Sequence, residues 1–255
     1  MLRHSPTQSS LLSYGDVSSV MESQSGLIWV GTAGNGIDVL DLNKGLIGQY
    51  RPNSEDENAL GDGGITALAQ TPKGEIWVGT RQSGLHRFNK STGNFQRFTS
   101  KDGLLNNYIH IILPADNDTL WVSTSGGLNK FDSKSQQFSS ISTVDQPNTP
   151  FTEHADSLVI DPSGNLWIGG QSGLYVLAKG EALLQRFYHD KNKINSLAHN
   201  DVNALLIDKK NTLWVATDKD YQRLTSWGNG QANFESIGSN LKDKIVAMGQ
   251  KNLVE

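Results

Sequence analysis

The sequence predicts an all-β fold, a β-propeller of four-stranded antiparallel blades with five complete repeats and partial flanking blades. Three observations predict it. A segment centred on tryptophan recurs every 44 to 48 residues, turn residues separate short apolar segments, and each repeat exposes apolar residues on both faces. The repeats are marked by Trp29, Trp77, Trp121, Trp167 and Trp214.

The first strand of each repeat is an apolar segment that begins twelve residues before the tryptophan. Nearly every position in it is aliphatic or β-branched, which suits a strand that is covered on both faces. We therefore expect it to be the innermost strand of the sheet. The five segments are 17–20, 65–68, 109–113, 155–160 and 202–207.

The second strand carries the tryptophan and follows a tight turn such as 161–165, where Pro presets φ and Gly or Asn accepts a positive φ. A glycine bend leads to the third strand, whose two apolar residues are three positions apart and lie on opposite faces. In the fifth repeat Tyr221 replaces the expected glycine, so the sequence predicts a longer loop over 218–223, with Leu224 and Trp227 as the apolar pair.

The fourth strand is marked by aromatic residues, and the loop after it contains a leucine five residues before the next first strand. We expect this leucine to fill the gap between neighbouring units. Units with two apolar faces are unstable alone and must stack on each other, which favours a propeller. A β-sandwich or an open β-solenoid is the alternative. The leucines are Leu12, Leu60, Leu104 and Leu197.

The chain is expected to form a single β-propeller region over 1–255 that is a fragment of a longer protein. Residues 4–17 align without a gap on 189–202, and 241–248 resembles another loop and first strand, so the chain begins and ends inside repeats. The predicted repeats cover about 16–60, 64–104, 108–150, 155–197 and 201–240, with a partial blade at 241–255.

Composition excludes several classes of function. The net charge of −4 provides no basic surface for nucleic acid, so we expect no nucleic acid partner and no membrane contact by this segment. The absence of cysteine excludes disulfides and thiol chemistry. No apolar run approaches the ~20 residues that span a bilayer. We expect no cofactor.

The repeats resemble the two-component regulator propeller repeat. The residues that carry the resemblance are 161–169, 120–132 and the lead-in to the fifth repeat at 189–197. The resemblance implies a periplasmic sensor module of a bacterial membrane receptor, either a histidine kinase or a GGDEF diguanylate cyclase. It also implies oligosaccharide ligands, and a receptor homodimer is a further possible partner arrangement in the full-length protein.

Candidate ligand-binding residues lie where the repeats stop agreeing. With the strands running outward in order, the bend after the second strand and the loop before the first strand share one face, and variable loops carry function more often than the scaffold does. In contrast, the tryptophans are interpreted as packing residues and the threonines that follow them as turn residues. The candidates are Asn35, Arg81, Gln82, Asn107, Tyr108, Ser125, His154, Gln171, Ser172, His199, Asp218, Lys219, Asp220 and Tyr221.

No catalytic or metal-binding motif is found. The six histidines fall in different repeats and lack metal-ligand spacing, and the residues after Asp218 and Asp220 lack the glycine and glutamate of a calcium loop. His86 and His110 lie on predicted strands and are interpreted as structural or surface residues. We therefore expect neither a metal nor an enzyme.

The favoured function is ligand sensing, in which an oligosaccharide or another small ligand binds the loop face and a conformational signal is transmitted. The alternative is a protein-interaction scaffold that uses the same face. A polysaccharide lyase or a streptogramin-type lyase is less favoured. It would use Glu153 with His154, or the 218–220 carboxylates, as acid and base.

Overall fold

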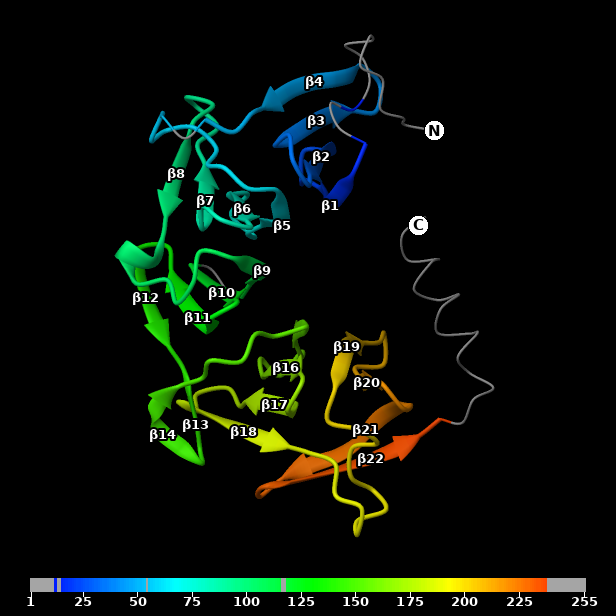
Figure 1. Ribbon diagram of the computed structural model, residues 1–255. Coiled ribbons are helices and arrows are strands. Elements are labelled where there is room, and N and C mark those ends of the chain that lie inside the picture. The colour runs from blue at the N-terminus through cyan, green and yellow to red at the C-terminus, as the bar shows by residue number, and fades with distance from the viewer. Residues whose placement is uncertain (1–11, 13–14, 54, 116–117, 238–255) are drawn as a thin grey trace. The chain divides into compact units, whose positions relative to one another are not determined.

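The computed structural model describes residues 12, 15–53, 55–115 and 118–237, and its strands form five sheets (Figure 1). Four sheets have four strands and one has six. The sheets are antiparallel except for one parallel pairing in the six-stranded sheet, between β13 (Ser142–Thr143) and β18 (Leu183–Phe187). The predicted all-β propeller fold with five repeats is confirmed.

The chain divides into two compact units, Met1–Ile141 with Phe151–His154, and Ser142–Pro150 with Ala155–Glu255. The first unit holds three sheets, and their strands follow the order of the chain. These strands are β1 (Val17–Glu22), β2 (Leu27–Thr32), β3 (Ile37–Asp41) and β4 (Gly45–Tyr50), then β5 (Ile65–Gln70), β6 (Ile76–Thr80), β7 (Leu85–Phe88) and β8 (Phe95–Phe98), then β9 (Ile109–Pro114), β10 (Thr119–Thr124), β11 (Gly127–Asp132) and β12 (Gln137–Ser140).

The second unit holds two sheets. Its strands are β13 and β14 (Gln146–Pro150), β15 (Ser157–Ile160), β16 (Leu166–Gly170), β17 (Gly173–Leu177) and β18, then β19 (Val202–Ile207), β20 (Leu213–Thr217), β21 (Tyr221–Gly228) and β22 (Gln231–Ser236). The hairpin of β13 and β14 extends the outer edge of one sheet, and every residue of β14 is exposed. This hairpin was not predicted.

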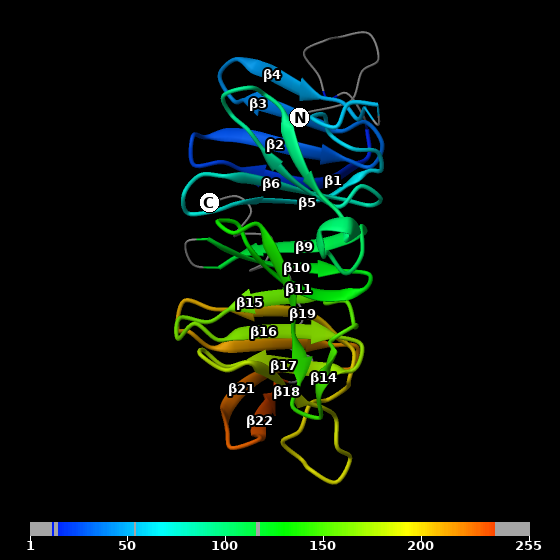
Figure 2. The same ribbon diagram turned by 90° about the vertical axis from the view of Figure 1, so that its left-hand side faces the viewer.

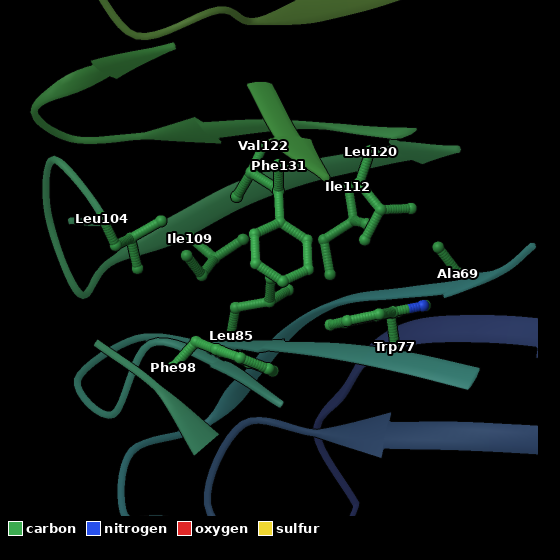
Figure 3. Packing of buried hydrophobic residues seen from close by; sticks show 10 residues of the cluster. All are labelled: Ala69, Trp77, Leu85, Phe98, Leu104, Ile109, Ile112, Leu120, Val122 and Phe131. Atoms are coloured by element: carbon green, nitrogen blue, oxygen red, sulfur yellow. The ribbon is translucent and has the colours of Figure 1, made fainter. Parts of the chain in front are cut away.

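Three of the five tryptophans pack one blade against the next, as predicted. Trp29 meets the ring of Phe88 edge-on at 5.1 Å, Trp77 meets Phe131 at 5.4 Å, and in the second unit Trp167 meets Trp227 at 5.1 Å. Figure 3 shows the cluster around Trp77, with contributions from both neighbouring sheets of the first unit. The recurring leucines are buried in these clusters, which confirms that they fill the gap between neighbouring blades. They are Leu60, Leu104 and Leu197.

The glycine two residues after tryptophan is required by this packing. A Cβ added to Gly79 would lie 2.6 Å from Cγ2 of Ile109, the first residue of the neighbouring sheet, and Gly31 faces Ile65 in the same way at 2.5 Å. The first unit therefore brings its sheets together at these glycines. Figure 2 shows β5 running beside β1 in the same unit.

Two predictions from the sequence are wrong. β1, the first strand of the first repeat, is not covered on both faces, because Val20 is 62% exposed. In the fifth repeat the loop is not longer, because Tyr221 already pairs with Ala216 and the N–H of Thr217 donates to the carbonyl of Asp220. Asp220 thus occupies the bend where other repeats have glycine, and Trp227 lies in an extended hairpin of β21 and β22.

A buried polar side chain near the start of the third strand holds the loop that enters the blade. His86 Nε2 accepts the N–H of Gly61 at 3.2 Å, and Asn129 Oδ1 accepts that of Leu105 at 2.9 Å. Gln222 does the same for Ala198 in the second unit, at 2.7 Å. In each case the donor directly follows the recurring leucine, so this side chain keeps that leucine in place.

An aspartate six residues before tryptophan ties the turn to the indole in two repeats. Asp161 Oδ2 accepts the Nε1–H of Trp167 and Asp208 Oδ2 accepts that of Trp214, each at 2.9 Å. Burial opposes ionisation of Asp161, but hydrogen bonds from Trp167, Asn165 and Ser163 outweigh it and hold its pKa below the usual value. The carboxylate is therefore the form that the fold stabilises.

We expect Asp161→Asn to lower the free energy of unfolding by about 2 kcal/mol, because asparagine is uncharged and keeps only one acceptor oxygen for the donors that bind the carboxylate, among them the buried indole N–H. The measurement is urea denaturation at neutral pH. Asp132→Asn is the control, since its exposed carboxylate accepts hydrogen bonds from Ser135 but touches no indole. Equal losses from the two substitutions would contradict the role of the indole bond.

The only helix among the described residues is a short 3-10 turn, η1 (Ser100–Asp102), so none of them forms a helix able to cross a membrane. The alignment of residues 4–17 and the partial blade at 241–255 involve segments outside the described residues, apart from Leu12 and 15–17.

Candidate functional site

The bend after the second strand is built by threonine, as predicted. Thr32, Thr80, Thr124 and Thr217 donate their hydroxyl to the carbonyl three or four residues later at 2.9 to 3.0 Å. In each of these repeats the same hydroxyl accepts a backbone N–H inside the bend. The bend is therefore fixed, and the residue directly after each threonine projects from a rigid support.

Backbone hydrogen bonds join this bend to the loop that precedes the first strand. Arg81 N–H donates to the Gly64 carbonyl, Ser125 N–H to Tyr108, and in the second unit Asp218 N–H to Asp201. The two segments therefore lie together at one end of each of these blades, which confirms the shared loop face within each blade. We call this end of the blade the loop face.

A β-bulge places a third residue at the loop face. The register shifts at the second residue of the first strand in four blades, which are those with Ser18, Thr66, His110 and Asn203. A bulge re-aims one side chain out of the regular alternation. In the third and fifth repeats the bulge residue contacts the residue after the second strand, since His110 meets Ser125 and Asn203 meets Asp218.

In the first unit these positions build a stack that we call the aromatic ladder, formed by Arg81, Tyr108, His110 and His154. The Arg81 guanidinium lies over the Tyr108 ring at 5.8 Å. Tyr108 stacks on His110 with centroids 4.5 Å apart and an interplanar angle of 21°, and His110 stacks on His154 at 5.0 Å and 28°. His110 and His154, which are 44 positions apart in the chain (154 − 110), are thereby brought into contact.

Ser125 completes the ladder, because its Oγ lies 2.9 Å from His110 Nε2. Arg81 and Ser125 are exposed, while the three rings are half-buried. None of these side chains belongs to the hydrophobic clusters that hold the sheets together. The ladder therefore presents hydrogen-bonding groups to solvent from a well-supported surface.

The remaining predicted residues of the first unit lie outside the ladder. Asn107 Oδ1 accepts the N–H of Ser100 and so shapes its own loop. Asn35 donates its N–H to Thr32 Oγ1 and its carbonyl accepts from Arg51. Gln82 is exposed beside Gly63. Of the seven candidates in this unit, the ladder unites Arg81, Tyr108, Ser125 and His154.

The second unit gathers a different set on its loop face. One ligand atom each from His199, Asp201 and Asp218 lies within 4.8 Å of the others. His199 Nδ1 is 3.4 Å from Asp201 Oδ2, and Asp218 Oδ1 accepts from Asn203 Nδ2 at 2.7 Å. One imidazole and two carboxylates suit a divalent cation. Exposed groups of this kind are common without a cation, so we assign no metal to them.

The other predicted residues of the second unit have mixed roles. Asp220 caps its own bend and Tyr221 begins β21, so both serve the fold. The Ser172 carbonyl accepts two hydrogen bonds from Arg186, while Gln171 and Lys219 are exposed.

Sequence reasoning missed the bulge residues. His110 was placed on a strand and interpreted as structural or surface, yet it is the centre of the ladder. Asp201 and Asn203 were not singled out, although they occupy the positions in the fifth repeat that Tyr108 and His110 occupy in the third. The signal was available in the aligned repeats, because the residues on either side of the first apolar position vary among them.

A cavity of about 1070 Å³ in the first unit does not coincide with this site. It is lined by β7, β8 and their turns together with residues 57–58 and 73–75, and it contains none of the predicted site residues. Of its charged residues, Arg87 meets Glu75 at 3.5 Å and Lys73 pairs with Asp118. The loop face is the better candidate because side chains from several loops stack on each other there.

Comparisons with known proteins confirm the resemblance. The model of the two component regulator propeller matches residues 59–82 and 196–219, two windows that each run from the recurring leucine to the bend after the second strand. No curated protein matches the chain.

Solved structures share the fold. One is described as the extracellular domain of a hybrid two component system, BT3049 from B. thetaiotaomicron, with 21% identity, a TM-score of 0.69, and coverage of 89% of this chain and 31% of that one. The extracellular domain of BT4673, described as a one component system of the same organism, has 23% identity, a TM-score of 0.64, and coverage of 85% and 28%. The chain thus spans less than a third of either relative.

Virginiamycin B lyase from Staphylococcus aureus is also similar, with 13% identity, a TM-score of 0.63, and coverage of 91% of this chain and 72% of that one. Extracellular domains of one and two component systems and a lyase therefore share this fold, and the fold by itself does not decide between binding and catalysis.

Proposed function

We propose that this propeller is the ligand-sensing region of a bacterial membrane signalling receptor, a two-component sensor or a diguanylate cyclase, and that it lies in the periplasm. The match to the two component regulator propeller supports this proposal, as do the extracellular sensor domains that share its fold. The region itself is proposed to bind an oligosaccharide or another small ligand and to catalyse no reaction.

The observation that carries the proposal is the aromatic ladder. Its four side chains come from three different loop-face segments and stack on each other, although the hydrophobic clusters do not include them. Polar and aromatic side chains that converge on a rigid loop surface are typical of binding sites. A ligand at the ladder would contact several blades of the first unit at once.

Signal transmission follows from differential affinity. A ligand shifts a receptor between two arrangements only if it binds one of them more tightly. In this proposal the ligand bridges the loop segments at residues 81, 108–110 and 154, and so favours one arrangement of receptor subunits. The output of the receptor then follows the population of that arrangement.

The test is a binding screen of oligosaccharides, peptides and small metabolites by thermal shift, followed by calorimetry on each hit. We expect Tyr108→Ala and His110→Ala to weaken binding at least tenfold, because each removes the centre of the stack. Tyr188→Ala is the matched control, since Tyr188 is an exposed tyrosine beneath the guanidinium of Arg186 and lies outside the ladder. It should leave the affinity unchanged.

Other outcomes would contradict ligand sensing. A stoichiometric protein partner recovered from the periplasm, with no small ligand, would favour a protein-interaction scaffold. Turnover of a glycan or a cyclic peptide that is lost in His154→Ala or Asp218→Asn would favour a lyase. The absence of any saturable ligand in the screen would count against the site.

A further inference from the structure

The ladder leaves few ring faces open. Tyr108 has the Arg81 guanidinium and His110 as neighbours, and His110 has Tyr108 and His154. Each stacked neighbour covers part of a ring face. Neutral sugars bind aromatic residues largely by laying their C–H groups on an open face, and the neighbours of Tyr108 and His110 reduce the open area of these two rings. A ligand must instead meet the polar edges of the stack.

These edges are rich in hydrogen-bond donors. The guanidinium has five N–H groups and no acceptor, the phenol has one O–H, and each imidazole has at least one N–H. The Ser125 hydroxyl beside His110 Nε2 holds that ring in place. Such an array matches a group that is rich in acceptors, namely a carboxylate or a sulfate.

Arg81 provides the positive charge that a carboxylate or sulfate group requires. Among the described arginines of the first unit, Arg51 and Arg87 pair with Asp38 and Glu75 at 3.2 and 3.5 Å. Arg97 donates to the Ala59 carbonyl at 3.4 Å.

Arg81 differs from all three. Within the part of the chain that the structure describes, its side chain pairs with no carboxylate and donates to no carbonyl, and it is exposed. An arginine remains protonated at any physiological pH. Its packing on Tyr108 therefore positions a guanidinium fork whose charge is not neutralised.

We propose that the aromatic ladder binds an acidic glycan, in which a carboxylate or sulfate group is held by Arg81 and the neighbouring donors of Tyr108, His110 and His154. This inference rests on the proposed function and narrows its ligand class. Arg81 provides bidentate recognition of the acidic group, and the imidazole edges and Ser125 contact the adjoining oxygens. A neutral glycan of the same length lacks the group that Arg81 recognises.

The experiment compares three ligands of equal length by calorimetry on the intact chain: a uronate tetrasaccharide, a sulfated tetrasaccharide and a neutral glucose tetrasaccharide. We expect at least one acidic ligand to bind tenfold or more tightly than the neutral one, with an affinity that falls as salt is raised. Arg81→Gln should remove the preference, and Arg81→Lys should restore only part of it because lysine lacks the planar fork.

Arg186→Gln is the matched control, because Arg186 also lies over a tyrosine ring, that of Tyr188 at 5.6 Å, but its guanidinium is bound to the Ser172 carbonyl. It should keep the preference for acidic ligands. Equal binding of neutral and acidic glycans, or an unchanged preference in Arg81→Gln, would overturn the inference and leave ligand sensing intact. Failure of all three glycans would overturn the inference, while a ligand of another class at the ladder would still support sensing.

Discussion

Gly79→Ala is expected to lower the free energy of unfolding by about 3 kcal/mol, the upper part of the range for an overpacked core. The new Cβ would lie 2.6 and 2.9 Å from two atoms of Ile109 and 3.2 Å from the Cβ of Ala67. Ile109 is fully buried at the first position of β9, so it has no open space to move into. The two sheets must therefore separate locally.

Gly48→Ala provides the matched control. Gly48 also lies in a strand, β4, but its added Cβ meets nothing closer than 3.6 Å, an ordinary contact. This substitution should be neutral or slightly stabilising, because alanine has less backbone freedom in the unfolded chain. Thermal and urea denaturation of the two variants check the prediction. A similar loss in both would show that close packing at Gly79 is not the cause.

Acid is expected to destabilise the first unit through His86. Burial is the main reason that the pKa of His86 falls to about 3, and the charge of Arg97 adds to it. The unfolded chain has an ordinary histidine pKa near ~6.5. Below that pH the unfolded state binds a proton that the folded state does not bind, so stability is complete above pH ~6.5 and declines as the pH falls toward 3.

The expected loss at pH 4.5 is roughly 3 kcal/mol, since each unit of pKa difference corresponds to ~1.4 kcal/mol. His86→Gln should remove this pH dependence and keep the fold, because Gln222 accepts a loop N–H at the same position of β21. Urea denaturation between pH 7 and 4.5 measures the effect. If the stability of His86→Gln followed the wild-type curve, another group would be responsible.

The fold could be predicted because the contacts between blades follow the repeat of the sequence. Trp29 and Trp77 pack against an aromatic residue of the next blade, and the glycine two residues after each of them makes room for Ile65 or Ile109. The tryptophan recurs in all five repeats and the glycine in three of them, so these packing demands leave a periodic trace. The fifth repeat was misread because a bend can also be built with Asp220, whose backbone closes the same hydrogen bond to Thr217 as glycine does.

The candidate site could be predicted only in part. The sequence pointed to Arg81, Tyr108, Ser125 and His154 because the loop face collects residues that differ among repeats. His110 was missed because the simple alternation of a strand does not reveal a bulge, which turns one side chain to the loop face. Residues from different loops can stack only if neighbouring sheets bring those loops close together. The spacing of residues along the sequence does not give the distance between the loops.

The exposed hairpin of β13 and β14, at the edge of the six-stranded sheet, affects how readily the protein aggregates. An unpaired edge strand is a template on which another chain can add by backbone hydrogen bonds. In β14, Pro147 and Pro150 have no N–H, so among its five residues only Gln146, Asn148 and Thr149 can donate. The sheet therefore ends in a strand that recruits a further chain poorly, which protects a repetitive protein against growth into aggregates.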